Sequence, residues 1–256
     1  MIKYTKNNPL RVITLFSGYD SQCLALDRVG VPYDLVAWCE IDNDAIQAHN
    51  SLFPQYADRN VGDITKVDAS TLPDCDLITW SFPCTDISQA GLQAGLSQDS
   101  GTRSSLAWDA IRIFEAKRPK YLMMENVKAL VSSKFIKDYH KILSTLDRIG
   151  YTTFTEVLNA KNFGVAQNRE RVFGISILRT DDEPNQKYHF PKPIPLELCL
   201  GDILEEDVDE KYFLSDEMLA RFCEKSMEEE SSLSMPIDAM NNPVVDEDFE
   251  NFFVAQ

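Results

Sequence analysis

The stretch DLITWSFPC, from Asp76 to Cys84, places a cysteine shortly after an apolar run. A short run that contains Leu, Ile, Thr and Trp and stops before a proline is typical of a buried strand. We therefore predict a strand over residues 76–80. The Cys84 thiol would then lie at the edge of a sheet, just beyond the end of this strand.

Two other apolar runs stand next to polar clusters in a similar way. Tyr121–Met124 is followed by Glu125-Asn126-Val127, and Val172–Leu178 is preceded by Gln167-Asn168-Arg169-Glu170-Arg171. A thiol, a carboxylate and two guanidinium groups therefore stand at the ends of three predicted strands. Because ligands bind at the ends of strands in open α/β sheets, we expect these side chains to form one site.

The chain up to residue 178 alternates between strand patterns and helix patterns. Further strands are predicted over residues 12–16 and 35–39, and helices over about 24–29, 43–52, 104–116 and 135–149. This alternation predicts a doubly wound, Rossmann-like α/β sheet that is mostly parallel, with helices on both faces. Thr152–Leu158 and Val172–Leu178 have no helix pattern between them, so we expect an antiparallel hairpin at the sheet edge.

The formal net charge of −16 lies mostly near the C-terminus. Residues 202–256 contain 17 acidic and three basic residues, so the rest of the chain is close to neutral. Such a body can still hold a local basic cleft for nucleic acid. We predict an α/β domain over residues 1–180, a linker and the start of a further region over 181–222, and an irregular acidic tail over 223–256.

Composition also limits the compartment and the kind of site. The six cysteines include no Cys-x-x-Cys pair, so we expect no metal site and no disulfide scaffold, and a reducing cytoplasm fits best. No segment approaches the roughly 20 apolar residues that span a bilayer. We therefore expect a soluble cytoplasmic protein with no membrane partner.

The same edge of the predicted sheet carries residues suited to an adenosine-containing cofactor. The first strand leads into the turn Phe16-Ser17-Gly18-Tyr19-Asp20, and Glu40 ends the second strand, where a carboxylate can accept hydrogen bonds from both ribose hydroxyls. The alternative is that Glu40 caps the helix that begins near Asn43. The pattern Gly-x-Gly-x-x-Gly is absent from the sequence, which disfavours a nicotinamide or flavin enzyme.

Asp63 is a second acidic candidate on the cofactor side. Its carboxylate could accept from an adenine amino group, while Ile41 and Ile64 pack on the two faces of the ring. The alternative is that Asp63 is only a turn residue after Gly62.

In order and content, these motifs resemble the cytosine-C5 DNA methyltransferase family. The resemblance covers about residues 11–178, and its motifs are Phe16-x-Gly18, Glu40, Gly62-Asp63-Ile64, Pro83-Cys84, Glu125-Asn126-Val127 and Gln167-x-Arg169-x-Arg171. It implies a catalytic domain that uses S-adenosylmethionine to methylate duplex DNA at a flipped cytosine. One departure is that the family has further glycines after Gly18, where this chain has Asp20-Ser21.

The resemblance also implies a role for each residue of the site. Cys84 is the nucleophile that adds to C6 of cytosine, Glu125 protonates N3, Arg171 contacts O2, and Arg169 holds the backbone or the Cys84 loop. From the residues alone, Glu125 could instead pair with a base such as Lys128. The implied cofactor-binding residues are Phe16, Gly18, Tyr19, Glu40, Ile41, Asp63, Ile64, Phe82 and Pro83; the implied substrate-binding residues are Ser88, Gln167 and Asn126, which could also brace the site.

The family's closing motifs and recognition domain are not found after residue 178, although residues 191–222 look like the entry to such a domain. We therefore expect the catalytic half of a split enzyme, with a second chain that carries the recognition domain, or a truncated copy. Two other functions stay open. One is a non-catalytic subunit or regulator that acts through the acidic tail. The other is a tRNA cytosine-C5 methyltransferase, because that branch of the family also tolerates Thr after the catalytic cysteine, as in Cys84-Thr85.

Overall fold

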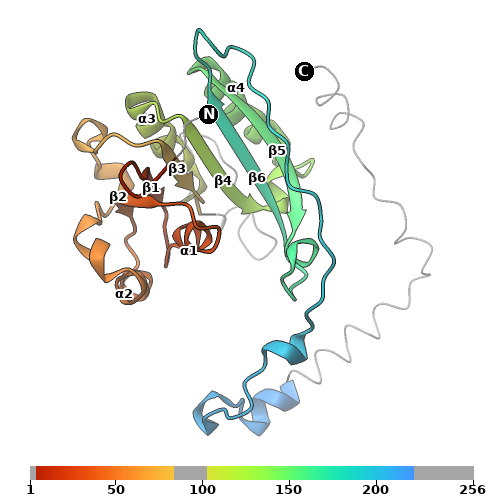
Figure 1. Ribbon diagram of the computed structural model, residues 1–256. Coiled ribbons are helices and arrows are strands. Elements are labelled where there is room, and N and C mark those ends of the chain that lie inside the picture. The colour runs from red at the N-terminus through yellow and green to blue at the C-terminus, as the bar shows by residue number, and fades with distance from the viewer. Residues whose placement is uncertain (1–3, 84–102, 222–256) are drawn as a thin grey trace, which may run out of the picture. The chain divides into compact units, whose positions relative to one another are not determined.

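The computed structural model describes residues 4–83 and 103–221 (Figure 1). The predicted site residues Cys84 and Ser88 and the predicted tail over 223–256 lie outside these ranges. The chain divides into two compact units, residues 1–198 and 199–256, which are described separately. This division reflects which residues pack together. It does not test the functional boundaries at residues 180 and 222, which stay predictions.

A six-stranded sheet with the order β2-β1-β3-β4-β6-β5 forms the centre of the first unit (Figure 1). The strands β2, β1, β3 and β4 are parallel, whereas β6 is antiparallel to both β4 and β5. The predicted parallel sheet with an antiparallel hairpin at its edge is therefore confirmed. The strands are β1 (Leu10–Leu15), β2 (Tyr33–Cys39), β3 (Leu77–Trp80), β4 (Tyr121–Val127), β5 (Tyr151–Asn159) and β6 (Glu170–Leu178).

In the described part of the first unit, four α-helices cover the two faces of the sheet: α1 (Ser21–Arg28), α2 (Asn43–Leu52), α3 (Ala107–Lys117) and α4 (Ile136–Arg148). Successive side chains of β1 point to opposite faces. Val12 packs in a cluster with Cys23 of α1 and Ile46 of α2. Ile13 and Leu15 belong to a larger cluster that contains residues of α3 and α4. Each face thus has its own apolar core, as the doubly wound prediction requires.

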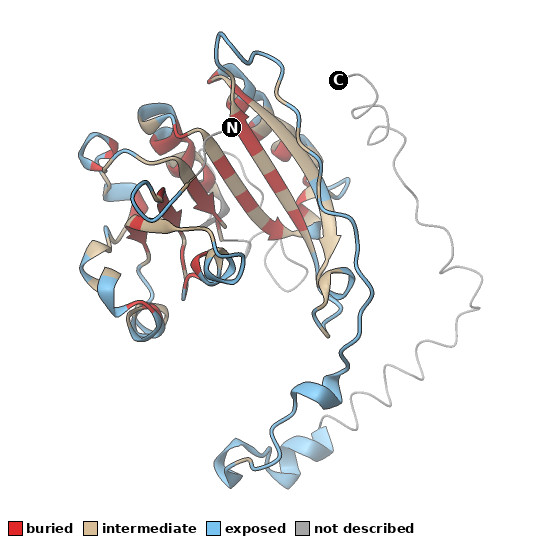
Figure 2. Ribbon diagram, viewed as in Figure 1, coloured by how far each residue is buried: buried red, intermediate tan, exposed pale blue. Residues whose placement is uncertain are grey.

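β4 is longer than the apolar run that predicted it. The strand continues through Glu125-Asn126-Val127, because β6 pairs with it over this stretch, with Glu125 opposite Phe173 and Val127 opposite Arg171. Figure 2 shows β4 alternating between buried and half-buried residues. Asn126 therefore points to the same face as the buried Met124, and Glu125 points to the opposite face. The polar cluster lies within the strand, rather than after it as we had predicted.

The helix predicted over 104–116 also begins differently. Its first turn is a 3-10 turn over Arg103–Leu106, and the α-helix proper starts at Ala107. In the second unit, a 3-10 turn covers Leu200–Ile203. Among the described residues, no helix has the length and apolar character needed to cross a membrane.

Candidate active site

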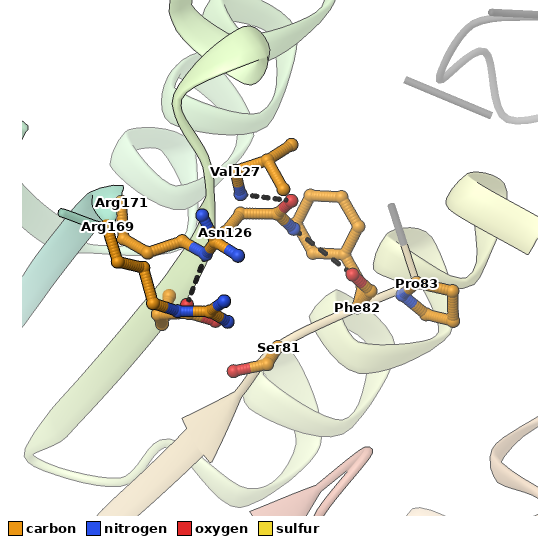
Figure 3. A pocket seen from close by; sticks show the side chains of 8 residues that line it. Ser81, Phe82, Pro83, Asn126, Val127, Arg169 and Arg171 are labelled. Atoms are coloured by element: carbon orange, nitrogen blue, oxygen red, sulfur yellow. Dashed lines mark hydrogen bonds and ion pairs between the residues drawn. The ribbon is translucent and has the colours of Figure 1, made fainter. Parts of the chain in front are cut away.

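A cavity of about 170 Å³ lies where the loop after β3 meets β4 and the start of β6 (Figure 3). Cavities of about 150 Å³ hold a benzene ring, so this one has room for a single six-membered ring. The residues that line it are Ser81, Phe82, Pro83, Glu125, Asn126, Val127, Arg169 and Arg171. The structure therefore brings together members of all three polar clusters, as the sequence predicted.

An ion pair between Glu125 and Arg171 lies in the wall of this cavity. Arg171 Nε is 3.1 Å from Glu125 Oε1, and both side chains are partly exposed. The two residues come from neighbouring antiparallel strands, in which Arg171 lies opposite Val127. Lys128, the alternative partner of Glu125, pairs instead with Glu170 at 3.1 Å. Glu125 therefore does pair with a base, as the alternative interpretation held, but that base is Arg171 and not Lys128.

Asn126 ties β4 to the loop that leads to Cys84. Its side chain is only 3% exposed. Its Nδ2 donates to the Phe82 carbonyl at 3.1 Å, and its Oδ1 accepts from the Val127 N–H at 2.9 Å, as Figure 3 shows. The Phe82 carbonyl belongs to the peptide that enters Pro83, the residue before Cys84. In these contacts Asn126 acts as a brace, and its predicted contact with substrate stays a prediction.

The remaining predicted residues of this side divide into two groups. Arg169 lines the cavity, and its backbone N–H donates to the Asn159 side chain at 3.1 Å. Gln167 is exposed and is not among the residues that line the cavity. Cys84 and Ser88 fall outside the described residues, so their predicted roles stay predictions.

Three of the other cysteines have environments unsuited to a nucleophile. Burial raises the pKa of Cys39 and of Cys75 to about 12, and burial also raises the pKa of Cys23. A thiol with a raised pKa carries little thiolate near neutral pH, and the thiolate is the reactive form. All three side chains pack in or against the apolar core clusters.

On the cofactor side, Glu40 links the end of β2 to the first turn. Its Oε2 accepts from the Gly18 N–H at 2.9 Å, and its Oε1 accepts from the N–H groups of Ile41 and Asp42 at 2.8 and 3.0 Å. The N-cap of α2 is Asp42, whose side chain accepts from the Ala45 N–H at 2.9 Å. The alternative interpretation of Glu40 as the cap of this helix is therefore wrong.

Asp63 is engaged locally, as the turn interpretation proposed. Its Oδ1 accepts from Thr65 N–H and Thr65 Oγ1 at 3.0 and 2.8 Å, which caps the 3-10 turn Ile64–Lys66. These hydrogen bonds, together with Lys66, lower the pKa of the Asp63 carboxyl. Asp63 therefore stays ionised at neutral pH and keeps Oδ2, which lies 3.2 Å from Lys66 Nζ, at the surface.

The apolar residues next to Glu40 and Asp63 differ in how far they are exposed. Ile41 is 68% exposed and Tyr19 is 52% exposed, so both present area that a bound ring or chain can cover. Ile64 is 4% exposed and packs in the main core cluster. Phe16 and Gly18 both adopt positive φ angles, 57° and 56°, which fold the first turn back toward Glu40.

Asp20, the departure from the family pattern, is completely buried. It has φ 67° and ψ 55° and precedes α1, so it occupies a backbone conformation that favours glycine. Its Oδ2 accepts from Thr14 Oγ1 at 2.8 Å and lies 3.6 Å from Nε2 of the buried His49. The His49 ring in turn stacks on Trp38 with 3.8 Å between the ring centres. The side chain therefore holds the first turn from inside the fold.

Two asparagines near the site were missed by the sequence reasoning. Asn60 bonds to the backbone of Glu40 and Gly62, and Asn159 bonds to the backbone of Arg169. Each lies close to a predicted motif in the sequence or in space. An asparagine in a loop belongs to no periodic apolar pattern, however, and asparagine is common in turns. The sequence therefore does not distinguish these two residues from ordinary turn residues.

Comparison with solved structures places this fold in a class. The crystal structure of S. pombe Dnmt2 methyltransferase matches with a TM-score of 0.61 at 21% sequence identity, over 84% of this chain and 66% of that one. At this level of identity the match concerns the fold, which is that of an α/β, Rossmann-like methyltransferase.

Sequence comparison then gives the family. The profile described as C-5 cytosine-specific DNA methylase matches residues 10–250, which extends well beyond the motifs that end at residue 178. The Type II methyltransferase M2.ScrFI of Lactococcus lactis subsp. cremoris is 38% identical over 82% of this chain and 72% of its own length. The Type II methyltransferase M.NlaX of Neisseria lactamica is 37% identical over 81% of this chain and 64% of its own. This chain belongs to the C-5 cytosine-specific DNA methylase family.

The match to these relatives covers only part of their length. The chain spans 72% and 64% of the two relatives above, and about half of several others in the same family.

Proposed function

We propose that this chain is the catalytic part of a DNA methyltransferase that transfers a methyl group from S-adenosylmethionine to C5 of a cytosine flipped out of duplex DNA. The observation that carries the proposal is the ring-sized cavity lined by Glu125, Arg169 and Arg171 beside Pro83. A flipped base needs a pocket of this size, with polar groups that read its hydrogen-bonding edge.

In the proposed reaction each residue of the site has a separate role. Cys84 would attack C6 as a thiolate, so that a bond forms between sulfur and C6 and the electrons move toward N3. Glu125 would supply the proton that N3 takes up, and Arg171 would donate to O2. Entry of the base between Glu125 and Arg171 would replace their 3.1 Å contact with contacts to the ring. Once C5 has taken the methyl group, N3 would return its proton to Glu125. Loss of the C5 proton to water and departure of the thiolate from C6 would then restore the aromatic ring.

S-adenosylmethionine, when bound, supplies the electrophilic methyl group that the activated C5 takes. The residues after β1 and β2 fit such a group, because they offer carboxyl oxygens next to exposed apolar surface. Glu40 would accept from ribose hydroxyls while it keeps its bond to the Gly18 N–H, and Asp63 would accept from the adenine amino group. Ile41 and Tyr19, both largely exposed, would cover apolar parts of the cofactor. Phe16, Ile64, Phe82 and Pro83 would form the rest of the pocket.

Duplex DNA is the partner that this function requires, and we propose a second chain that carries the recognition domain. The relatives come from bacteria and phages, which supports a cytoplasmic enzyme of prokaryotic or phage origin.

Transfer of labelled methyl from S-adenosylmethionine to unmethylated duplex DNA tests the proposal, with unmodified tRNA as a parallel substrate and Cys84→Ser as the control. Labelling of DNA that is lost in the Cys84→Ser variant is the expected result. Labelling of tRNA alone would move the function to RNA. Failure with both substrates, even with a candidate recognition chain added, would favour the non-catalytic alternative.

A further inference from the structure

Three chain segments that are far apart in sequence form the cofactor side of the sheet: the turn after β1, the end of β2 and the loop before Asp63. Direct contacts join the first two, because Ser17 N–H donates to the Cys39 carbonyl at 3.1 Å and Gly18 N–H donates to Glu40. The loop before Asp63 has no strand of its own. Its place relative to Glu40 therefore depends on individual hydrogen bonds.

Asn60 supplies most of these bonds. Its Oδ1 accepts from the Glu40 N–H at 3.2 Å and from the Gly62 N–H at 2.9 Å, and its Nδ2 donates to the Glu40 carbonyl at 3.1 Å. The backbone N–H of Val61 adds a bond to the Trp38 carbonyl at 2.8 Å. One half-buried side chain thus holds both backbone polar groups of Glu40 and fixes the start of the turn that leads into Asp63.

The chemistry of this position selects an amide. The side chain must accept two hydrogen bonds and donate one, over the short reach of a single methylene. Aspartate lacks the donor and would place a second negative charge beside Glu40. Alanine offers none of the three bonds. Gly62, at φ 71°, would then be held mainly by the Cys39 thiol, which donates to the Gly62 carbonyl at 2.7 Å.

We propose that Asn60 is a positioning residue for S-adenosylmethionine: it holds the ribose-binding Glu40 and the adenine-binding Asp63 at a fixed separation. This inference rests on the proposed cofactor, because it assigns Asn60 no contact with the cofactor itself. Its effect should appear in cofactor affinity, and not in the base cavity formed by the loop after β3, β4 and the start of β6.

Asn159 provides a matched control within the same chain. It is also half-buried and also makes three side-chain hydrogen bonds: it accepts from the N–H groups of Lys161 and Arg169 at 3.2 and 3.1 Å, and it donates to Asn168 at 2.7 Å. These contacts brace the start of β6 beside the base cavity. Asn159→Ala therefore removes as many bonds as Asn60→Ala, but on the substrate side.

The experiment is calorimetric titration of S-adenosylmethionine into the wild-type chain and into the Asn60→Ala, Asn60→Asp and Asn159→Ala variants, with urea unfolding of each. Asn60→Asp keeps the size and the acceptor oxygen, so it remains a test if Asn60→Ala does not fold. We expect both Asn60 variants to bind at least fivefold more weakly than wild type and Asn159→Ala to bind within twofold of it. Where methyl transfer is measurable, the Asn60 variants should raise KM for the cofactor and keep kcat within about twofold.

The outcomes separate the inference from the function on which it rests. If the wild-type chain does not bind S-adenosylmethionine, the proposed cofactor is wrong. If it binds and the folded Asn60 variants bind within twofold of it, Asn60 has no positioning role. An equal loss of affinity in the Asn60 and Asn159 variants would also overturn the inference, because it would indicate general loosening of the fold.

Discussion

Replacement of Asn126 by alanine should damage stability and catalysis together, because this side chain joins β4 to the loop before Cys84. The variant loses the bond to the Phe82 carbonyl, which is buried, and the bond from the Val127 N–H. A buried polar group left without a partner costs about 1–3 kcal/mol, so we expect the free energy of unfolding to fall by about 2–4 kcal/mol. Urea unfolding followed by circular dichroism measures this quantity.

The effect on catalysis follows from the same bond. If it contributes about 1–2 kcal/mol to holding the Phe82-Pro83 peptide in place, its loss lowers the population of correctly placed loops, and hence kcat, by about 5- to 30-fold. Methyl transfer at saturating DNA and S-adenosylmethionine measures kcat. The fall should persist at temperatures well below the unfolding midpoint, where nearly all molecules are folded.

Ser176→Ala is the control for this prediction. Ser176 is buried and its hydroxyl lies 2.9 Å from Thr153 Oγ1, between β6 and β5 and away from the cavity. Its loss should lower the free energy of unfolding by about 1 kcal/mol and leave kcat unchanged. If Asn126→Ala also leaves kcat within twofold of wild type, the loop does not depend on Asn126 and the reasoning is refuted.

Three further predictions concern other parts of the site. Glu125→Gln should lower kcat by about 10²–10⁴-fold without weakening binding of S-adenosylmethionine in a titration, because it removes a proton donor from the base cavity alone; unchanged kcat would exclude the acid role. Since burial raises the pKa of Cys39 and Cys75 to about 12, iodoacetamide at about pH 8 should alkylate them in urea but not in the native protein, as read by mass spectrometry, and rapid native labelling would contradict their burial. His49→Phe should lower the free energy of unfolding by about 1–3 kcal/mol, because the buried Asp20 loses the polar neighbour 3.6 Å from its Oδ2; Asp20→Asn in the same background should recover part of this loss, and no recovery would show that the Asp20 carboxyl is not its cause.

The sequence predicted the architecture because periodic burial determines it. Alternating apolar runs and helix patterns predicted every strand to within a few residues. The helix α2 over Asn43–Leu52 was predicted with both ends correct, since its apolar residues recur on one face, although its N-cap is Asp42 and not Glu40. The length of β4 was not predictable from its own composition. Its last three residues are polar or half-buried, and they form a strand only because β6 pairs beside them.

The site was predictable to the extent that function requires unusual residues at strand ends. Glu125, Arg169 and Arg171 stood out because charged groups beside apolar runs are costly unless they are used or paired. The actual partner of Glu125 could not be read from the sequence, since strand pairing brings Arg171 rather than Lys128 to it. The burial of Asp20 was equally hidden, because it depends on His49, which lies on a helix that begins more than 20 residues later.

In each loop that carries the site, an asparagine side chain forms hydrogen bonds with the backbone. Apolar patterns in the sequence do not reveal such hydrogen bonds. Asn60 fixes the loops of the cofactor side, Asn126 fixes the peptide before Pro83, and Asn159 fixes the backbone of Arg169. Each bonds through both its amide oxygen and its amide nitrogen, and each ties down backbone that lies outside a regular hydrogen-bonded ladder. A catalytic site needs the side chains that touch the substrate held within about 0.5 Å of their productive positions, which loops cannot provide by apolar contact alone. Hydrogen bonds from asparagine, a short side chain that both donates and accepts, meet that need. They leave the cavity and the cofactor edge open to their ligands.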